Sequence, residues 1–363
     1  MADVALTGNT RMRFPGISSR AYEHPTDRGA LVVLRAVPGF DAVLRAIAGA
    51  ISDRAERLLY LSSAVRVGPG QYPELAELRD ECVSTLDVPD VPELYVFRSP
   101  QATAMTIGMD KPFIALSTEL VSLLDLDGLR FTIGHEMGHV LSGHAVYRTM
   151  LLRLIRLTQS MAWMPIGYWS LRAVVAALRE WYRKSELSCD RAGLLCGQDP
   201  PAALRAQIQL AGALDPDRVH IPSFLRQAQE YNAVPDVRDS VLKLLQVVDS
   251  PHPMSVVRAA ELQKWAASEG YRSILSGDYP RRSDDRDVKF TDEARAAADN
   301  YRNNLRESAD PLAKAVTGLG GVLSDAAGSV RRWMKPNGAT DEPEATQPDE
   351  DATGGRDRTS SPS

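Results

Sequence analysis

The spacing of hydrophobic and polar residues is typical of helices over most of the chain. Apolar side chains recur every three or four positions over residues 38–67 and again over 73–85. Three short runs rich in β-forming residues break this pattern, at 93–98, 102–108 and 112–116. Further helices are expected over 127–153, with Asp127 as N-cap, and over 172–196, 201–214, 237–248, 291–307 and 311–333. The pattern predicts a mainly α protein with a small β-sheet, an α+β fold.

The apolar stretch between Arg156 and Arg172 contains Pro165 and Gly167 near its centre. It is shorter than the roughly 18 to 20 residues that cross a bilayer. The stretch is therefore expected to form two helices that meet at a break and pack on the protein. Peripheral contact with a membrane, through residues 157–171 or through an amphipathic helix at 312–333, is the alternative.

Composition narrows the classes of protein that fit. The 363 residues are 44% hydrophobic and 25% charged, which is enough apolar material for a folded core. A net charge of −5 argues against a protein that coats nucleic acid, so no nucleic-acid partner is expected. Three cysteines, and no apolar run of signal-peptide length in the first twenty residues, favour a cytoplasmic location.

The most specific chemical signal is an HExxH motif, His135-Glu136-Met137-Gly138-His139, inside an apolar helical run. Residues four apart lie on the same face of a helix, so both imidazoles can bind a single Zn²⁺. Glu136 can then reach a water bound to the metal. The alternative, two histidines that share this spacing by chance, fits the motif less well.

A catalytic zinc ion needs a third protein ligand and an open position for water. The segment KSELSCDRAG places Glu186 and Asp190 four residues apart on one face of a second predicted helix. Glu186 is the candidate ligand, and Asp190 is the candidate hydrogen-bond partner for the far nitrogen of a zinc-bound histidine. Without the histidines, such a pair is usually a solvated helix face. Other candidate donors are expected to be packed, structural or solvated: Cys189, His24 and His220.

The HExxH motif followed by Glu186 in an ExxxDR setting resembles peptidase family M48, a group of gluzincin zinc metallopeptidases. The resemblance covers about residues 70–265. It implies a zincin-like metallopeptidase fold with one zinc ion per chain. Together with the helical pattern, it predicts an N-terminal helical extension at 1–69, a metallopeptidase domain at 70–275 and a C-terminal helical extension at 276–334. The acidic tail at 335–363 contains no large apolar residue, so its composition predicts disorder.

The resemblance also implies roles for residues outside the motif. His144 matches a histidine that commonly follows HExxH, although a five-residue step from His139 turns it away from the zinc-facing side. His252 and Arg258 are implied as donors to the oxyanion of the transition state. Four residues align with a strand that lines the substrate cleft: Thr103, Ala104, Met105 and Thr106. Thr103 and Met105 stand where the family has Asn and Phe, and an ordinary buried strand is the alternative to a substrate-pairing edge.

These features predict a zinc-dependent endopeptidase that acts on proteins or peptides, with Glu136 as general base. One alternative is a catalytically silent, metal-stabilised scaffold that binds a partner. Another is a latent enzyme whose cleft is covered by the segment around 163–169 or by the tail.

Overall fold

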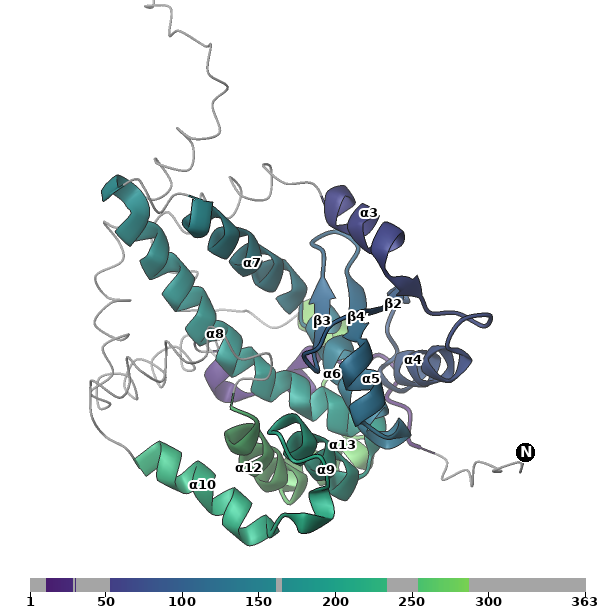
Figure 1. Cartoon of the computed structure of the whole chain (residues 1–363). Helices are drawn as coiled ribbons and strands as arrows, with labels where there is room; N and C mark the ends of the chain where they lie inside the picture. The colour runs from purple at the N-terminus through teal and green to yellow at the C-terminus, as the bar shows by residue number, and fades with distance from the viewer. Residues whose placement is uncertain (1–10, 29, 31–52, 161–164, 234–253, 287–363) are drawn as a thin grey trace, which may run out of the picture.

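The computed structural model describes residues 11–28, 30, 53–160, 165–233 and 254–286, which form helices around one small sheet (Figure 1). The sheet has the strand order β1-β2-β4-β3. This arrangement confirms the predicted α+β class. The predicted helices at 237–248, 291–307 and 311–333 and the acidic tail lie outside the described residues, as does the first half of the predicted helix at 38–67.

The sheet contains the three predicted strands and one that was not predicted. β2 (Leu94–Phe97) pairs in parallel with β4 (Phe113–Ser117), which pairs antiparallel with β3 (Ala104–Ile107). β1 (Val65–Arg66) pairs antiparallel with β2, although periodicity predicted helix through residue 67. The prediction was wrong there because α3 (Asp53–Ser63) ends early and the amide of Val67 bonds to the carbonyl of Leu94, 2.8 Å away.

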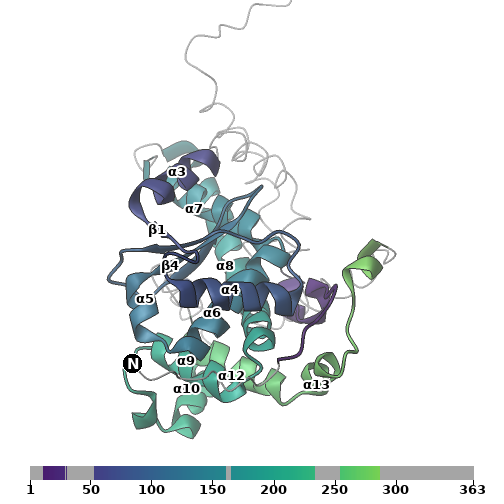
Figure 2. The ribbon, with the colours of Figure 1, turned by 90° about the vertical axis from the view of Figure 1, so that its right-hand side faces the viewer.

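The two faces of the sheet pack against different helices. Side chains alternate along a strand, so Tyr95 and Ala115 lie on one face and Val96 and Leu116 on the other. The first face packs with Tyr60 of α3 in a small aromatic cluster. The second joins the main core under α4 (Pro73–Leu86) and the helices behind it (Figure 2). β3 lies at the edge of the sheet, with its Ala104 side chain in the main core.

The predicted helix from 127 to 153 is two helices in the structure. α6 (Leu126–Leu141) precedes a break and α7 (His144–Ser160) follows it, and the short α5 (Thr118–Leu123) lies before them. Gly143 ends α6 with a φ of +68°, a conformation that favours glycine. The predicted N-cap was two residues late, because the Asp125 carboxylate accepts the amide of Gly128 at 2.7 Å.

α8 (Pro165–Gly197) is the longest described helix and packs closely against α6. A Cβ atom at Gly134 would lie 2.6 Å from the Cβ of Cys196, and one at Gly138 would lie 2.8 Å from that of Ala192. Side chains at these two positions would therefore force the helices apart. The glycines fix the separation between the HExxH motif and the segment that contains Glu186.

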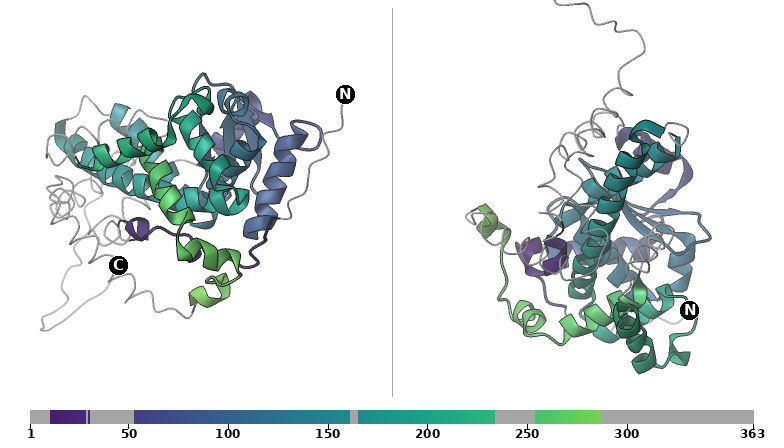
Figure 3. Two further views of the ribbon diagram at one scale, coloured as in Figure 1. Left: turned by 90° about the horizontal axis from the view of Figure 1, so that it is seen from below. Right: turned by 90° about the vertical axis from the view of Figure 1, so that its left-hand side faces the viewer.

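α7 and the first half of α8 form the predicted helical hairpin, and they lie side by side beyond the sheet (Figures 1 and 3). Residues 161–164 lie outside the described residues, so membrane contact through 157–171 stays a prediction. No helix within the described ranges combines the length and the apolar character needed to cross a membrane.

Smaller helices complete the body around the lower half of α8. They are α9 (Pro200–Leu210), α10 (Ile221–Ala233), α12 (Ser255–Ala266) and α13 (Glu269–Leu275). The N-terminal residues 11–28 also pack here, because Phe14, Ile17 and Tyr22 belong to the main core. The predicted division at residue 69 stays a prediction, although this part of the N-terminal segment contacts the predicted peptidase domain directly.

Candidate metal centre

The two histidines of the HExxH motif lie on one face of α6, as its helical spacing requires. Both are buried, with 5% of His135 and none of His139 exposed to solvent. Their ring centroids are 5.0 Å apart. The helix therefore directs two imidazoles into a space closed off from bulk water.

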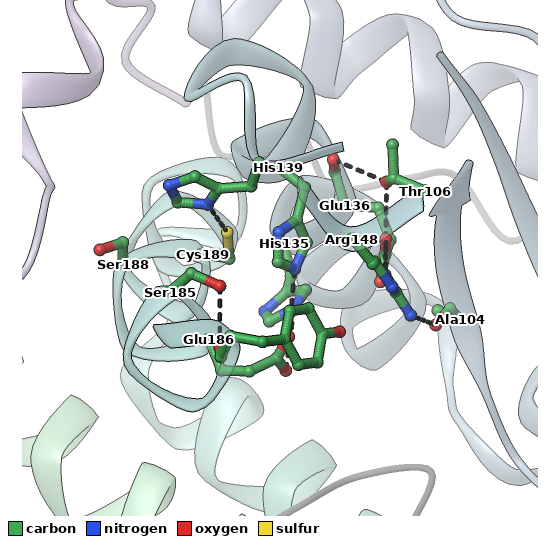
Figure 4. Close-up of polar contacts among 12 residues, drawn as sticks. Ala104, Thr106, His135, Glu136, His139, Arg148, Ser185, Glu186, Ser188 and Cys189 are labelled. Carbon is green, nitrogen blue, oxygen red and sulfur yellow. Dashed lines mark hydrogen bonds and ion pairs between the residues drawn. The ribbon is translucent and has the colours of Figure 1, made fainter. Parts of the chain in front are cut away.

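Glu186 of α8 extends its carboxylate to both rings (Figure 4). Its Oε1 lies 3.2 Å from Nε2 of His139, and its Oε2 lies 3.5 Å from Nε2 of His135. Donors at about 2.0 to 2.1 Å from a tetrahedral zinc ion would be about 3.3 Å from one another. The spacing of two nitrogens and a carboxylate thus fits this metal, and the donor chemistry is that of a zinc site.

Asp190 and Arg258 contact the candidate ligands His135 and Glu186. Nδ1 of His135 lies 3.0 Å from Oδ1 of Asp190, as expected for the partner that orients a ligating histidine. Arg258 of α12 donates from Nε and Nη2 to the two oxygens of Asp190, at 2.8 and 2.6 Å. Its Nη1 lies 2.8 Å from Oε2 of Glu186. All three nitrogens of Arg258 therefore contact the carboxylates that position the ligands.

The charges of the site are strongly coupled. Burial alone would raise the pKa of Glu186, but Arg258 and His135 hold it well below its usual range. Burial would lower the pKa of His135, yet Glu186 and Asp190 raise it to about 9. Burial lowers the pKa of His139 to about 4 despite the nearby Glu186. A carboxylate and a neutral imidazole are the forms that bind a metal, whereas His135 must first lose a proton.

Glu136 lies between the two histidines and the sheet, with a carboxylate oxygen within 4.8 Å of a ring nitrogen of each histidine. Its Oε2 accepts a hydrogen bond from the Thr106 hydroxyl at 2.6 Å and lies 3.3 Å from Nη1 of Arg148 (Figure 4). Burial raises the pKa of Glu136, but Arg148, the two histidines and Thr106 together lower it below its ordinary value. The carboxylate is therefore ionised, as a general base requires before it accepts a proton.

The predicted substrate strand lies beside Glu136 at the edge of the sheet. The carbonyl of Thr103 accepts the amide of Ser117 at 2.9 Å, so Thr103 and Met105 face β4. The backbone groups of Ala104 and Thr106 then face the outer edge, because orientation alternates along an antiparallel strand. The residues predicted to line the cleft are thus brought next to the candidate base.

A second group of buried donors lies behind His139. His139, His144 and Cys189 have donor atoms within 4.8 Å of one another. The ring of His144 contacts His139 edge-on at 5.6 Å, and its Nδ1 lies 3.6 Å from Sγ of Cys189. Its Nε2 lies 3.3 Å from Asp27 of the N-terminal segment. The predicted five-residue step along one helix does not describe its position, because His144 begins α7 after the break, and its two ring nitrogens face Cys189 and Asp27.

The remaining predicted residues lie farther from the centre. His220 is exposed, with Nδ1 2.8 Å from the Ser223 hydroxyl, and the half-buried His24 contacts Thr26. His252 lies outside the described residues, so its implied role stays a prediction.

Two residues at the site were missed by sequence reasoning. The Tyr182 ring stacks on His139 at 5.8 Å with an interplanar angle of 14°, and the Arg148 guanidinium lies 5.2 Å from the centre of that ring. Tyr182 precedes Glu186 by one helical turn, so spacing could have identified it. Arg148 has no motif that points to it, because only the approach of α7 to β3 places it at the site.

Comparison with known proteins gives two matches. The sequence model of peptidase family M48 matches residues 69–266. A protein of Arabidopsis thaliana described as plastoglobule-localized metallopeptidase 48, chloroplastic, is 31% identical over 269 residues, which cover 72% of this chain and 77% of that protein. No solved structure gives a significant match.

Proposed function

Because the chain belongs to peptidase family M48, and is therefore a metallopeptidase, we propose that it is a zinc-dependent endopeptidase with Glu136 as general base. One observation supports this proposal above the others. Two neighbouring helices bring His135, His139 and Glu186 to the spacing of zinc ligands, with a buried, ionised glutamate next to them.

His135, His139 and Glu186 would hold the zinc ion, which when bound supplies the positive charge that acidifies water and polarises a carbonyl. Glu136 takes the proton of the attacking water on a carboxylate oxygen and later transfers it to the nitrogen of the departing amine. The Thr106 hydroxyl, 2.6 Å away, keeps that carboxylate oriented during both transfers.

The outer edge of β3 binds the peptide substrate in this proposal. The backbone groups of Ala104 and Thr106 face that edge, where an extended peptide can add as a further strand. Main-chain hydrogen bonds of this kind do not depend on the side chains of the substrate. Thr103 and Met105 direct their backbone groups to β4, so they support the strand from behind.

Asp190 and Arg258 act on the ligands in this proposal. Resemblance implied that Arg258 donates to the oxyanion, but its three nitrogens contact Asp190 and Glu186. These contacts support a positioning role, in which Arg258 fixes Glu186 directly and fixes His135 through Asp190. His252 stays the candidate donor to the oxyanion on resemblance alone.

The proposed location is less specific. The Arabidopsis relative is named for plastoglobules, and the present chain keeps two predicted segments for peripheral lipid contact, 157–171 and 312–333. We therefore propose peripheral association with a lipid surface as an alternative to the predicted cytoplasmic location. Flotation of the protein with phospholipid vesicles would distinguish the two.

The decisive experiment compares zinc content with cleavage of casein, an unstructured protein. Wild type should contain one zinc ion and cleave casein, and Glu136→Gln should keep the zinc and lose activity by about two orders of magnitude or more. His139→Ala and Glu186→Ala should lose both. His220→Ala, a surface histidine, is the control and should change neither. A folded, zinc-loaded wild type that cleaves nothing would favour the scaffold alternative.

A further inference from the structure

Arg148 is a buried arginine for which the proposed chemistry has no use. It lies on α7, and only 12% of its side chain is exposed. Its guanidinium lies between the candidate base and the predicted substrate strand, above the ring of Tyr182 (Figure 4). The guanidinium is permanently charged and contacts both Glu136 and β3.

The first contact of Arg148 is with the edge of β3. Its Nη2 donates to the carbonyl of Ala104 at 3.3 Å. That carbonyl faces the outer edge of the strand, where the amide of an added peptide strand would donate. Arg148 therefore bonds to an acceptor that the peptide would use, and its guanidinium lies at the edge where the peptide would add.

A second residue of α7 contacts the residue that follows β3. The Thr149 hydroxyl accepts the amide of Gly108 at 3.0 Å. Gly108 directly follows the end of β3 and has a φ of +113°, so this contact holds α7 against the end of the strand. α7 thus contacts the edge of β3 at Ala104 and the residue after its last position, so a bound peptide and the present position of α7 compete for Ala104.

The other contact of Arg148 is with Glu136. Oε2 of Glu136, which Nη1 of Arg148 approaches, also accepts the hydroxyl of Thr106 from β3. The same side chain thus contacts both groups that the proposed reaction uses, the edge of β3 and the candidate base. Neither contact is short, since Nη1 to Oε2 and Nη2 to the Ala104 carbonyl are both 3.3 Å.

We propose that Arg148 holds the peptidase in a closed state, in which its guanidinium takes the place of the substrate amide on Ala104 and pairs with Glu136. A peptide must displace Arg148 from both partners before it is cleaved. This inference rests on the proposed function, because it assumes that β3 binds the substrate and that Glu136 is the base.

Binding measured apart from cleavage tests this proposal. The full-length, zinc-loaded Glu136→Gln variant is titrated against fluorescein-labelled casein by fluorescence anisotropy, with and without Arg148→Met. The side-chain amide that Glu136→Gln introduces still offers an oxygen to Arg148, so the closed state persists in the single variant. The double variant should bind casein roughly five- to tenfold more tightly, the effect of removing one competing hydrogen bond. Arg148→Lys keeps the charge but replaces the two nitrogens that contact Glu136 and Ala104 with one, so it should fall between them.

Controls separate this proposal from the proposed function. Arg205→Met removes a half-exposed arginine far from the site and should leave casein binding unchanged. Equal zinc content and thermal stability would show that the variants are intact. Unchanged or weaker binding by the double variant would overturn the closed state, whereas failure of Glu136→Gln to abolish cleavage would overturn the proposed function instead.

Discussion

The two buried arginines beside the metal centre differ in how firmly they are held. Arg258 makes three contacts of 2.6 to 2.8 Å with two carboxylates, in the fork geometry that gives the strongest ion pairs. Arg148 makes single contacts of 3.3 Å with one carboxylate and one carbonyl. The difference supports the two proposed roles, in which Arg258 positions the ligands and Arg148 is displaced when substrate arrives.

Their partners explain the difference. Glu186 and Asp190 keep their charge throughout the proposed reaction, so Arg258 never loses its counter-ions. Glu136 becomes neutral when it takes a proton, and Ala104 must offer its carbonyl to substrate. The two sides of the centre are therefore built for opposite purposes, one to remain constant and the other to change.

Removing Arg258 should have the largest effect. Arg258→Met leaves the carboxylates of Glu186 and Asp190 buried without their cation, which should lower the free energy of unfolding by about 3 to 5 kcal/mol. Denaturant unfolding of the zinc-loaded protein measures this. Arg205→Met, whose side chain is 42% exposed, should change it by less than about 0.5 kcal/mol. Equal stability of the two variants would show that Arg258 does not compensate the ligand carboxylates.

A buried carboxylate that bonds to a serine hydroxyl sharpens the comparison. Asp27 accepts the Ser188 hydroxyl at 2.6 Å and lies 3.3 Å from His144, and burial raises its pKa to about 7. A raised pKa favours the protonated form in the folded state, so its stabilising contribution is full below pH 4 and is lost as pH rises through 7.

Asp27→Asn should therefore flatten the dependence of stability on pH. The wild type should lose roughly 2 to 3 kcal/mol more than the variant between pH 5 and pH 8. Thermal unfolding across this range measures the difference, and Asp80→Asn, an exposed aspartate, is the control. Parallel curves for wild type and Asp27→Asn would show that Asp27 is ionised at both values of pH.

Local spacing predicted the half of the site that lies on helices. The four-residue steps from His135 to His139 and from Glu186 to Asp190 depend only on helix geometry, and the structure places both pairs at one centre. The break at Gly143 was missed because apolar residues continue across it, although a Ser-Gly pair after the last turn is a typical C-cap signal.

The other half depends on contacts distant in sequence, which periodicity does not report. Arg148 reaches Ala104 only because α7 crosses the edge of β3. The N-terminal residues Phe14 and Ile17 belong to the core without any helical or strand pattern of their own. β1 formed against a helical pattern because pairing with β2 outweighs local preference.

Replacing Asp190 tests the side of the centre that is proposed to stay unchanged, and its expected effect is smaller than those above. Asp190→Asn keeps an acceptor for Nδ1 of His135 but removes the charge that makes the imidazole a better ligand. Zinc affinity should fall about 10- to 100-fold, measured by competition with a chelating dye. Asp80→Asn again serves as the control. An unchanged affinity would mean that Asp190 supports the fold and not the metal.

The smallest predicted effect concerns Glu136, on the side of the centre where Arg148 is displaced in the proposed reaction. The Thr106 hydroxyl is the donor that stays with Glu136 after Arg148 has been displaced, so Thr106→Val should raise the pKa of that carboxylate. The acidic limb of the kcat/KM profile should then move to higher pH by about half a unit to one unit, because one hydrogen bond contributes about 1 kcal/mol. Thr132→Val removes a buried hydroxyl that bonds to the carbonyl of Gly128 on the same helix as Glu136, and its profile should coincide with that of wild type. If the acidic limb stays in place in Thr106→Val, a group other than Glu136 produces that limb. A change of charge on Glu136 would then no longer distinguish its side of the centre from the side of Arg258.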